Sequence, residues 1–178
     1  YELLGNIYYV SGDTAKGLAN YRTEIDQVSA SYDQGVALGL MLKVSPEAVE
    51  RAIGGAPARK FVTQMGQDSA LVYVYPSKQA YVYFTKTTKP PYKWELYGWR
   101  IGVSEAEGQQ PVSVSTMPYQ VVANDYLMKG NMAFAKGDKK EMAAEYEKSI
   151  PLLMTLQQID PTDEFASEKI PEVYSRLD

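Results

Sequence analysis

The sequence predicts an α+β protein in which a three-stranded antiparallel sheet with one short helix is flanked by N- and C-terminal helical hairpins. Two observations carry this prediction. Residues 5–21 and 130–146 repeat the same glycine, asparagine, aspartate and tyrosine positions 125 residues apart, and each copy continues into apolar residues at helical spacing. Between the copies lie segments rich in valine, tyrosine and tryptophan, which favour strands.

The first hairpin is expected within residues 1–34. Its second helix carries apolar residues at spacings of three and four, which form one stripe along an α-helix. The stripe consists of Leu18, Tyr21, Ile25, Val28 and Tyr32. Gly12-Asp13 precedes the stripe, and a glycine after one helix with an aspartate before the next is typical of a C-cap followed by an N-cap. The segment therefore predicts a helix, a tight turn and a second helix.

Residues 35–103 predict a small α/β domain. Ser45 as N-cap and Pro46 at the first helical position begin a short helix, and Gly54 ends it. After a polar stretch, three strand candidates follow: SALVYVYP, QAYVYFTKT and YKWELYGWRIGV. The short connection at Ser77 predicts an antiparallel hairpin between the first two strands.

Residues 104–118 are the best linker candidate, because they are rich in serine, glutamine and proline and lack apolar periodicity. The second hairpin, together with a C-terminal helix, is expected over residues 119–178. Gly137-Asp138 repeats the turn of the first hairpin, and Pro151 is expected to kink the last long helix. The separation of the matching hairpins predicts that the two ends of the chain meet in one compact unit.

Both hairpins resemble the tetratricopeptide repeat, a pair of antiparallel helices about 34 residues long. The matching residues are Tyr1, Leu4, Gly5, Tyr8, Gly12, Gly17 and Tyr21 in the first copy and Tyr126, Gly130, Gly137, Ala144 and Tyr146 in the second. The second copy departs from the pattern at Met142, where a small residue is usual, and the resemblance covers about 70 of the 178 residues. It implies a helical groove that captures a peptide. The alternative is a plain helical hairpin packed on the middle region.

The middle region resembles the small α/β fold of the outer-membrane assembly lipoproteins of the SmpA/BamE type. The matching segment runs from Gly39 to Pro57, with Ser45, Val49, Ile53, Gly54 and Pro57 in place and an extra residue before the proline. The strand candidates follow it in the order expected for that fold. The resemblance implies a periplasmic protein that binds other proteins and has no catalytic site.

The composition excludes several kinds of site. The chain has no cysteine and no histidine, so it has no disulfide, no thiol nucleophile, no Cys/His zinc site and no Ser-His-Asp arrangement. A net charge of −4 argues against a nucleic-acid binder, which normally carries a basic patch. The sequence shows no calcium loop and no glycine-rich phosphate loop. We therefore expect no metal, no cofactor and no enzyme activity.

Aromatic residues of the strand candidates are the best candidates for contacts with a partner protein. Alternate residues of a strand share a face, and this pattern predicts one aliphatic sheet face and one aromatic face. The aromatic face would carry Tyr73, Tyr75, Tyr81, Tyr83, Tyr97 and Trp99. Three interpretations stay open: the hairpins cover this face, it is an open surface for a protein partner, or it forms a pocket for a small molecule or glycan.

Together these patterns predict a non-catalytic protein-binding or assembly protein of the bacterial cell envelope. Residue 1 is tyrosine, and the expectation is that a signal sequence or lipid anchor has been removed upstream of it, which would place the protein in the periplasm or at the outer membrane. One alternative is a soluble, cytoplasmic tetratricopeptide-like adaptor that binds a peptide. A second alternative is an enzyme or small-ligand binder that uses a buried tyrosine or glutamate.

Overall fold

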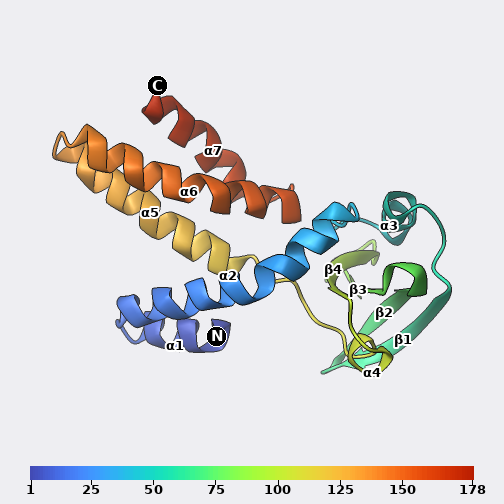
Figure 1. The fold of residues 1–178 in the computed structure, drawn as a ribbon. Coiled ribbons are helices and arrows are strands. Elements are labelled where there is room, and N and C mark those ends of the chain that lie inside the picture. The colour runs from blue at the N-terminus through green and yellow to red at the C-terminus, as the bar shows by residue number, and fades with distance from the viewer. The chain divides into compact units, whose positions relative to one another are not determined.

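The computed structural model describes residues 1–178 and divides the chain into two compact units. The helical unit consists of residues 1–29 and 115–178, and the sheet unit consists of residues 30–114. Figure 1 shows the helices and strands of each unit. The mixture of helices with an antiparallel sheet confirms the α+β class. Because both ends of the chain belong to the helical unit, the prediction that they meet is also confirmed.

The helical unit is built from two hairpins and a final helix. Its helices are α1 (Glu2–Val10), α2 (Thr14–Ala37), α5 (Met117–Ala135), α6 (Lys139–Ile159) and α7 (Glu164–Leu177), and α2 continues past residue 29 into the sheet unit. At the first turn Gly12 adopts a φ of 89°, and Asp13 Oδ1 accepts a hydrogen bond of 3.2 Å from the Lys16 N–H. At the second turn Gly137 adopts a φ of 76°, and Asp138 accepts one of 2.9 Å from the Glu141 N–H. The predicted caps are therefore confirmed.

Each hairpin is closed by a tyrosine that packs on a glycine of the preceding helix. A Cβ atom on Gly5 would lie 2.8 Å from the ring of Tyr21, and one on Gly130 would lie 2.5 Å from the ring of Tyr146. No real Cβ contact is that short, so only glycine lets the two helices approach this closely. The repeated glycine and tyrosine of the sequence therefore make the same helix–helix contact in both hairpins.

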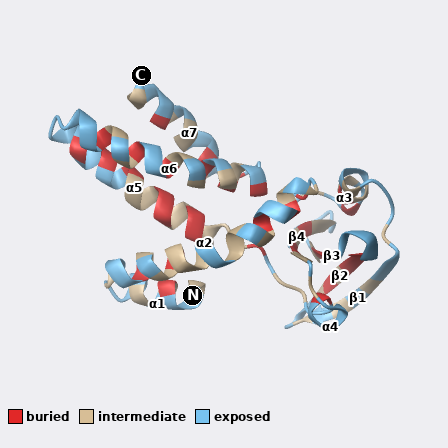
Figure 2. Cartoon of the chain, viewed as in Figure 1, coloured by how far each residue is buried: buried red, intermediate tan, exposed pale blue.

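The core of the helical unit lies between α5, α6 and α7. It consists of Ala123, Leu127, Ala133, Met142, Tyr146, Leu153 and Val173, all buried. Figure 2 shows buried stretches on each of the three helices. The helix α6 continues through Pro151, which is exposed, and α7 begins after the N-cap Asp163, whose side chain accepts a hydrogen bond of 2.9 Å from the Ala166 N–H. The exposed side of α6 thus tolerates the proline, since its ring meets solvent and not the core.

The sheet unit has four antiparallel strands in the order β1-β2-β3-β4, so the prediction of three strands is wrong. The strands are β1 (Arg59–Met65), β2 (Asp68–Tyr75), β3 (Ala80–Lys86) and β4 (Trp94–Ile101). They follow the short helix α3 (Pro46–Ile53), and the 3₁₀ turn η1 (Pro76–Lys78) joins β2 to β3. Ser45 caps α3 and Gly54 ends it in the left-handed conformation, as the sequence predicts.

The strand that the sequence pattern did not predict is β1, which lies in the polar stretch after the short helix α3. It is an edge strand whose burial alternates between exposed and partly buried residues, and Val62 is 59% exposed. An edge strand with solvent on one side needs few apolar residues, so its composition carries a weak signal. The clearest sequence sign is Gly66, which adopts a φ of 61° in a two-residue turn to β2.

The strand register overturns the prediction of one aliphatic and one aromatic face. Residues directly opposite each other in an antiparallel pair share a face, and here Tyr73 lies opposite Val82 while Val74 lies opposite Tyr81. The tyrosines of β2 therefore point to one face and those of β3 to the other. Alternation along a single strand cannot reveal this, because the register between strands decides it.

The stretch predicted as a linker folds against the sheet. It begins with the one-turn helix α4 (Glu105–Gly108), which is closed by a capping box between Ser104 and Glu107. The Tyr83 hydroxyl donates a hydrogen bond of 2.8 Å to the Gly108 carbonyl. Further along, a Cβ atom on Gly98 of β4 would lie only 1.9 Å from the Val112 carbonyl oxygen. These contacts make residues 104–114 the cover of one sheet face.

The other sheet face packs on the end of α2. The indole N–H of Trp99 donates a hydrogen bond of 3.1 Å to the Ser31 carbonyl, and the ring lies against Gly35. A Cβ atom on Gly35 would come within 2.1 Å of that ring, so glycine is required there. Both faces of the sheet are thus covered within the sheet unit.

Candidate binding pocket

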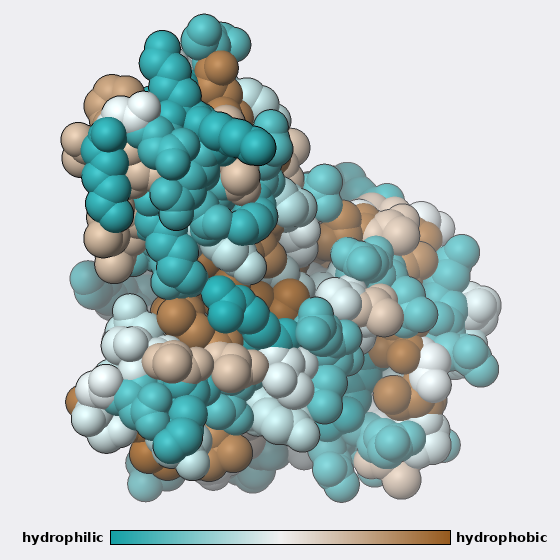
Figure 3. Space-filling model, turned by 60° about the vertical axis from the view of Figure 1, so that its left-hand side comes forward, coloured by the Kyte–Doolittle hydropathy of each residue, from teal (hydrophilic) through white to brown (hydrophobic).

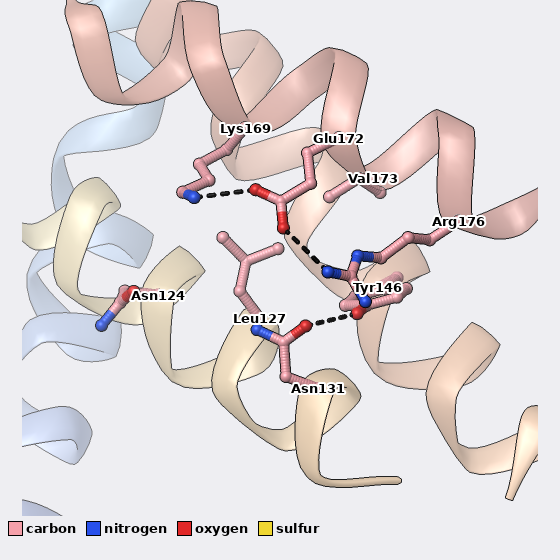
Figure 4. Close-up of a pocket in the computed structure, with 8 residues that line it drawn as sticks. All are labelled: Asn124, Leu127, Asn131, Tyr146, Lys169, Glu172, Val173 and Arg176. Carbon is pink, nitrogen blue, oxygen red and sulfur yellow. Dashed lines mark hydrogen bonds and ion pairs between the residues drawn. The ribbon is translucent and has the colours of Figure 1, made fainter. Parts of the chain in front are cut away.

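A small pocket opens between α5, α6 and α7 in the helical unit (Figure 4). It encloses about 70 Å³ and is lined by Asn124, Leu127, Asn131, Tyr146, Lys169, Glu172, Val173 and Arg176. This volume is well below the roughly 300–1,000 Å³ of a usual small-molecule pocket, so the cavity has room for a head group while the rest of a ligand would lie outside it.

The floor of the pocket is apolar. Leu127 is 6% exposed and Val173 is 1% exposed, and both belong to the core of the unit. The Tyr146 hydroxyl donates a hydrogen bond of 2.6 Å to Asn131 Oδ1, and this bond fixes the orientation of the carboxamide. Asn131 Nδ2 is therefore the group with which this side chain can donate a hydrogen bond to a ligand.

Charged residues of α7 form the rim. Glu172 accepts hydrogen bonds from Lys169 Nζ at 2.7 Å and from Arg176 Nη2 at 3.4 Å, as the dashed lines in Figure 4 show for these pairs. The hydrogen bond from Lys169 holds the pKa of Glu172 below its usual range, and burial opposes this shift only in part. The rim thus presents two cations that share one carboxylate, so a second carboxylate from a ligand would complete the pairing.

The polar groups of this pocket are suited to binding a ligand through hydrogen bonds. Two carboxamides and two cations recognise carboxylate or amide groups through hydrogen bonds. No group of three or more acidic side chains comes together to hold a metal ion. The pocket combines an apolar floor with five polar or charged side chains, a composition suited to a polar head group.

The six aromatic residues predicted to contact a partner lie inside the sheet unit. Tyr73, Tyr75, Tyr81, Tyr83 and Trp99 are buried, and Tyr97 is partly buried. Tyr81, Tyr83 and Tyr97 lie on the face covered by residues 104–114, whereas Tyr73, Tyr75 and Trp99 belong to the opposite face. The structure thus divides the six between two covered faces, and their role in binding stays a prediction.

Burial changes the acidity of three of these tyrosines. It raises the pKa of Tyr75 to about 12 and that of Tyr97 to about 12, and it also raises the pKa of Tyr83. In each case the cause is the loss of solvent around the phenolate, which is the charged form. These side chains serve the core as neutral, bulky groups.

Sequence reasoning missed most of the pocket. Asn131 belongs to the repeated glycine-asparagine pair, but the repeat suggested a packing role and no ligand contact. Lys169, Glu172 and Arg176 are spaced three and four apart, which places them on one face of a helix. That spacing is the signal that was available, although many solvent-exposed helices show the same pattern.

Comparison of the chain with protein-family models, curated proteins and solved structures finds no match. No helix combines the length and the apolar character that a membrane span requires. The geometry of the pocket is therefore the basis for a functional assignment.

Proposed function

We propose that the protein is a non-catalytic, tetratricopeptide-like adaptor that binds a segment of a partner protein. The observation that carries the proposal is the pocket between α5 and α7, where Asn131, Lys169 and Arg176 converge above an apolar floor. The glycine–tyrosine packing repeated in both hairpins supports the tetratricopeptide-like character, because it is the kind of close helix approach that such a repeat uses.

The head group that enters the pocket is a carboxylate or a backbone amide of the partner. Lys169 and Arg176 each already donate to Glu172, and a guanidinium has further N–H groups to offer. Asn124 and Asn131 supply both donors and acceptors for a peptide backbone. The remaining peptide would lie along α5 and α7, outside the small cavity.

A display library of random peptides selected against the intact protein tests this proposal. Peptides selected on the native chain should lose binding by about tenfold or more when Lys169→Ala or Arg176→Ala is introduced, since a charge-assisted hydrogen bond is lost. Lys140→Ala, an exposed lysine of α6 outside the pocket, is the matched control and should leave binding unchanged. Peptides that bind equally well to all three variants would overturn the assignment of the pocket.

We further propose that the protein acts in the bacterial cell envelope. The support is the resemblance of residues 39–57, and of the strands that follow them, to the SmpA/BamE lipoproteins. The N-terminal sequence encoded by the complete gene tests this location. A signal sequence with a lipidated cysteine would support it, and a cytoplasmic start codon directly before the first hairpin would contradict it.

A further inference from the structure

The helical unit carries a second hollow between α2, α5 and α6. It encloses about 400 Å³ and is lined by Arg22, Ile25, Asp26, Val122, Tyr126, Lys148, Pro151 and Leu152. We call it the α2–α5–α6 groove. In Figure 3 hydrophobic atoms are visible in the hollow between the lobes of the helical unit.

The groove combines an apolar floor with a cationic margin. Ile25, Val122 and Leu152 supply aliphatic surface, and Tyr126 lies among three cations. The Arg22 guanidinium lies 5.3 Å from the centre of the Tyr126 ring, and the ammonium groups of Lys129 and Lys148 each lie 5.8 Å from it. Arg22 and Lys129 share the single carboxylate of Asp125, so this part of the groove carries an excess of positive charge that favours an anion.

Arg22 leaves one buried donor without an acceptor. Its Nη2 atom lies 3.0 Å from Asp125 Oδ2, which also accepts from Lys129 at 2.8 Å. Its Nε–H is buried and has no hydrogen-bond partner within the chain. Buried donors are almost always satisfied, so an acceptor from outside the chain would complete the hydrogen bonding of this atom. A carboxylate is a suitable acceptor, because hydrogen bonds between a guanidinium and an ionised oxygen are strong.

The acidic residues near the groove leave room for this additional carboxylate. Asp125 is shared by Arg22 and Lys129, and Glu145 pairs with Lys148. Asp26 is exposed at the margin. Lys148 keeps a side-chain exposure of 51%, so its ammonium group is free to reach a second anion.

The groove and the pocket use opposite sides of α5. At 100° per residue, Val122 and Tyr126 lie on one side of the helix, and Asn124, Leu127 and Asn131 lie roughly on the other. A molecule in the α7 pocket therefore does not occupy the groove. The two sites are separable by substitution.

We propose that the α2–α5–α6 groove is a second binding site that takes an acidic, aliphatic segment of a partner protein. One carboxylate of the segment binds the Nε–H of Arg22 and the ammonium group of Lys148. A neighbouring leucine-like side chain packs on Ile25, Val122 and Leu152. Together with the pocket at α7, the groove would let the protein bind two segments at once. An assembly protein needs two such sites to bridge its partners.

The test uses blocked peptides in which leucine alternates with aspartate, asparagine or lysine. Titration of the full chain is followed by the NMR shifts of the Ile25 and Leu152 methyl groups. The aspartate peptide should shift both methyl groups and bind about tenfold or more tightly than the asparagine peptide, because the contact with Arg22 and Lys148 is charge-assisted. Equal binding of the aspartate and asparagine peptides, or tighter binding of the lysine peptide, would overturn the proposal.

Variants separate this site from the α7 pocket. Lys148→Glu should abolish the aspartate-dependent shifts of the Ile25 and Leu152 methyl groups, while Lys140→Glu on the same helix should leave them unchanged. Loss of these shifts with Lys169→Ala instead would show that they arise from a peptide in the α7 pocket, and this result would contradict the second site. Sedimentation of the free chain is the last measurement. A dimer that Lys148→Glu dissociates would assign the groove to a second copy of the chain and would also overturn the proposal.

Discussion

Tyr21 and Tyr146 each hold two helices together through the same pair of contacts. The ring packs on a glycine, and the hydroxyl donates to the asparagine that follows this glycine, at 2.7 Å to Asn6 and at 2.6 Å to Asn131. The glycine allows the close approach, and the hydrogen bond satisfies a hydroxyl that would otherwise be buried without a partner. At Asn131 the same bond also orients a side chain of the proposed pocket.

Gly130→Ala should destabilise the helical unit by about 1–3 kcal/mol, because its Cβ atom would overlap a ring that is 1% exposed and cannot move into solvent. Denaturant unfolding of the variant measures this loss. Combining Gly130→Ala with Tyr146→Leu should cost less than the sum of the two single changes, because the clash needs the ring. Strict additivity would show that the close contact is not responsible.

The buried tyrosines of the sheet unit predict a loss of stability at alkaline pH. The pKa of Tyr75 and that of Tyr97 are raised to about 12 in the folded protein, above the value of about 10 expected in the unfolded chain. Their contribution to stability is therefore complete below about pH 10 and is lost as the pH rises towards 12. Urea unfolding over this range, followed with tyrosinate absorbance, measures the loss. Tyr97→Phe should flatten the dependence, whereas Tyr92→Phe, at an exposed tyrosine, should leave it unchanged.

At the scale of the elements, two helices retain an internal proline and one strand depends on a glycine turn. Pro151 in α6 and Pro171 in α7 each lack the N–H that would bond to the carbonyl four residues earlier, and both positions are exposed. The burial of one side of each helix therefore outweighs poor local propensity. In the sheet, Gly66 sets the turn that brings β1 alongside β2.

Pro171→Ala should stabilise α7 by about 1–3 kcal/mol, because it restores a backbone hydrogen bond at an exposed site. Pro151→Ala should increase the stability by less, since Pro151 also lines the α2–α5–α6 groove and its contacts there would be lost. Thermal unfolding of the two variants compares these gains. A loss of stability in Pro171→Ala would show that the proline has a role beyond helix geometry.

At the scale of the whole molecule, the chain builds two cores from an interrupted sequence. Residues 1–29 join residues 115–178 in the helical unit, and residues 30–114 form the sheet unit between them. The core residues of the helical unit come from α5, α6 and α7, whereas the sheet unit buries residues of its own strands. A substitution inside one unit should therefore lower the stability of that unit's core more than the stability of the other.

Paired glycine substitutions test this division. Gly98→Ala places its Cβ atom 1.9 Å from the Val112 carbonyl oxygen, and this backbone clash should destabilise the sheet unit by roughly 2 kcal/mol or more. Native-state hydrogen exchange should then show the largest loss of protection in β3 and β4. In Gly130→Ala the largest loss should appear in α5 and α6. An equal loss in both units for either variant would indicate a single cooperative core.

The sequence by itself determined the elements whose signals are local. The capped turns at Asp13 and Asp138, the short helix after Ser45 and the two apolar strands β2 and β3 follow from caps, glycines and alternation along one segment. The 125-residue repeat also predicted that the ends meet, because each hairpin leaves an apolar face that needs a partner.

Only the tertiary structure decided which side chains share a surface. The register between β2 and β3 sends their tyrosines to opposite faces, and residues 104–114 cover one of these faces. The pocket joins Asn131 to Lys169 and Arg176, which lie on a different helix. The physical reason is that register and helix packing depend on contacts between segments far apart in the chain, and no local pattern records them.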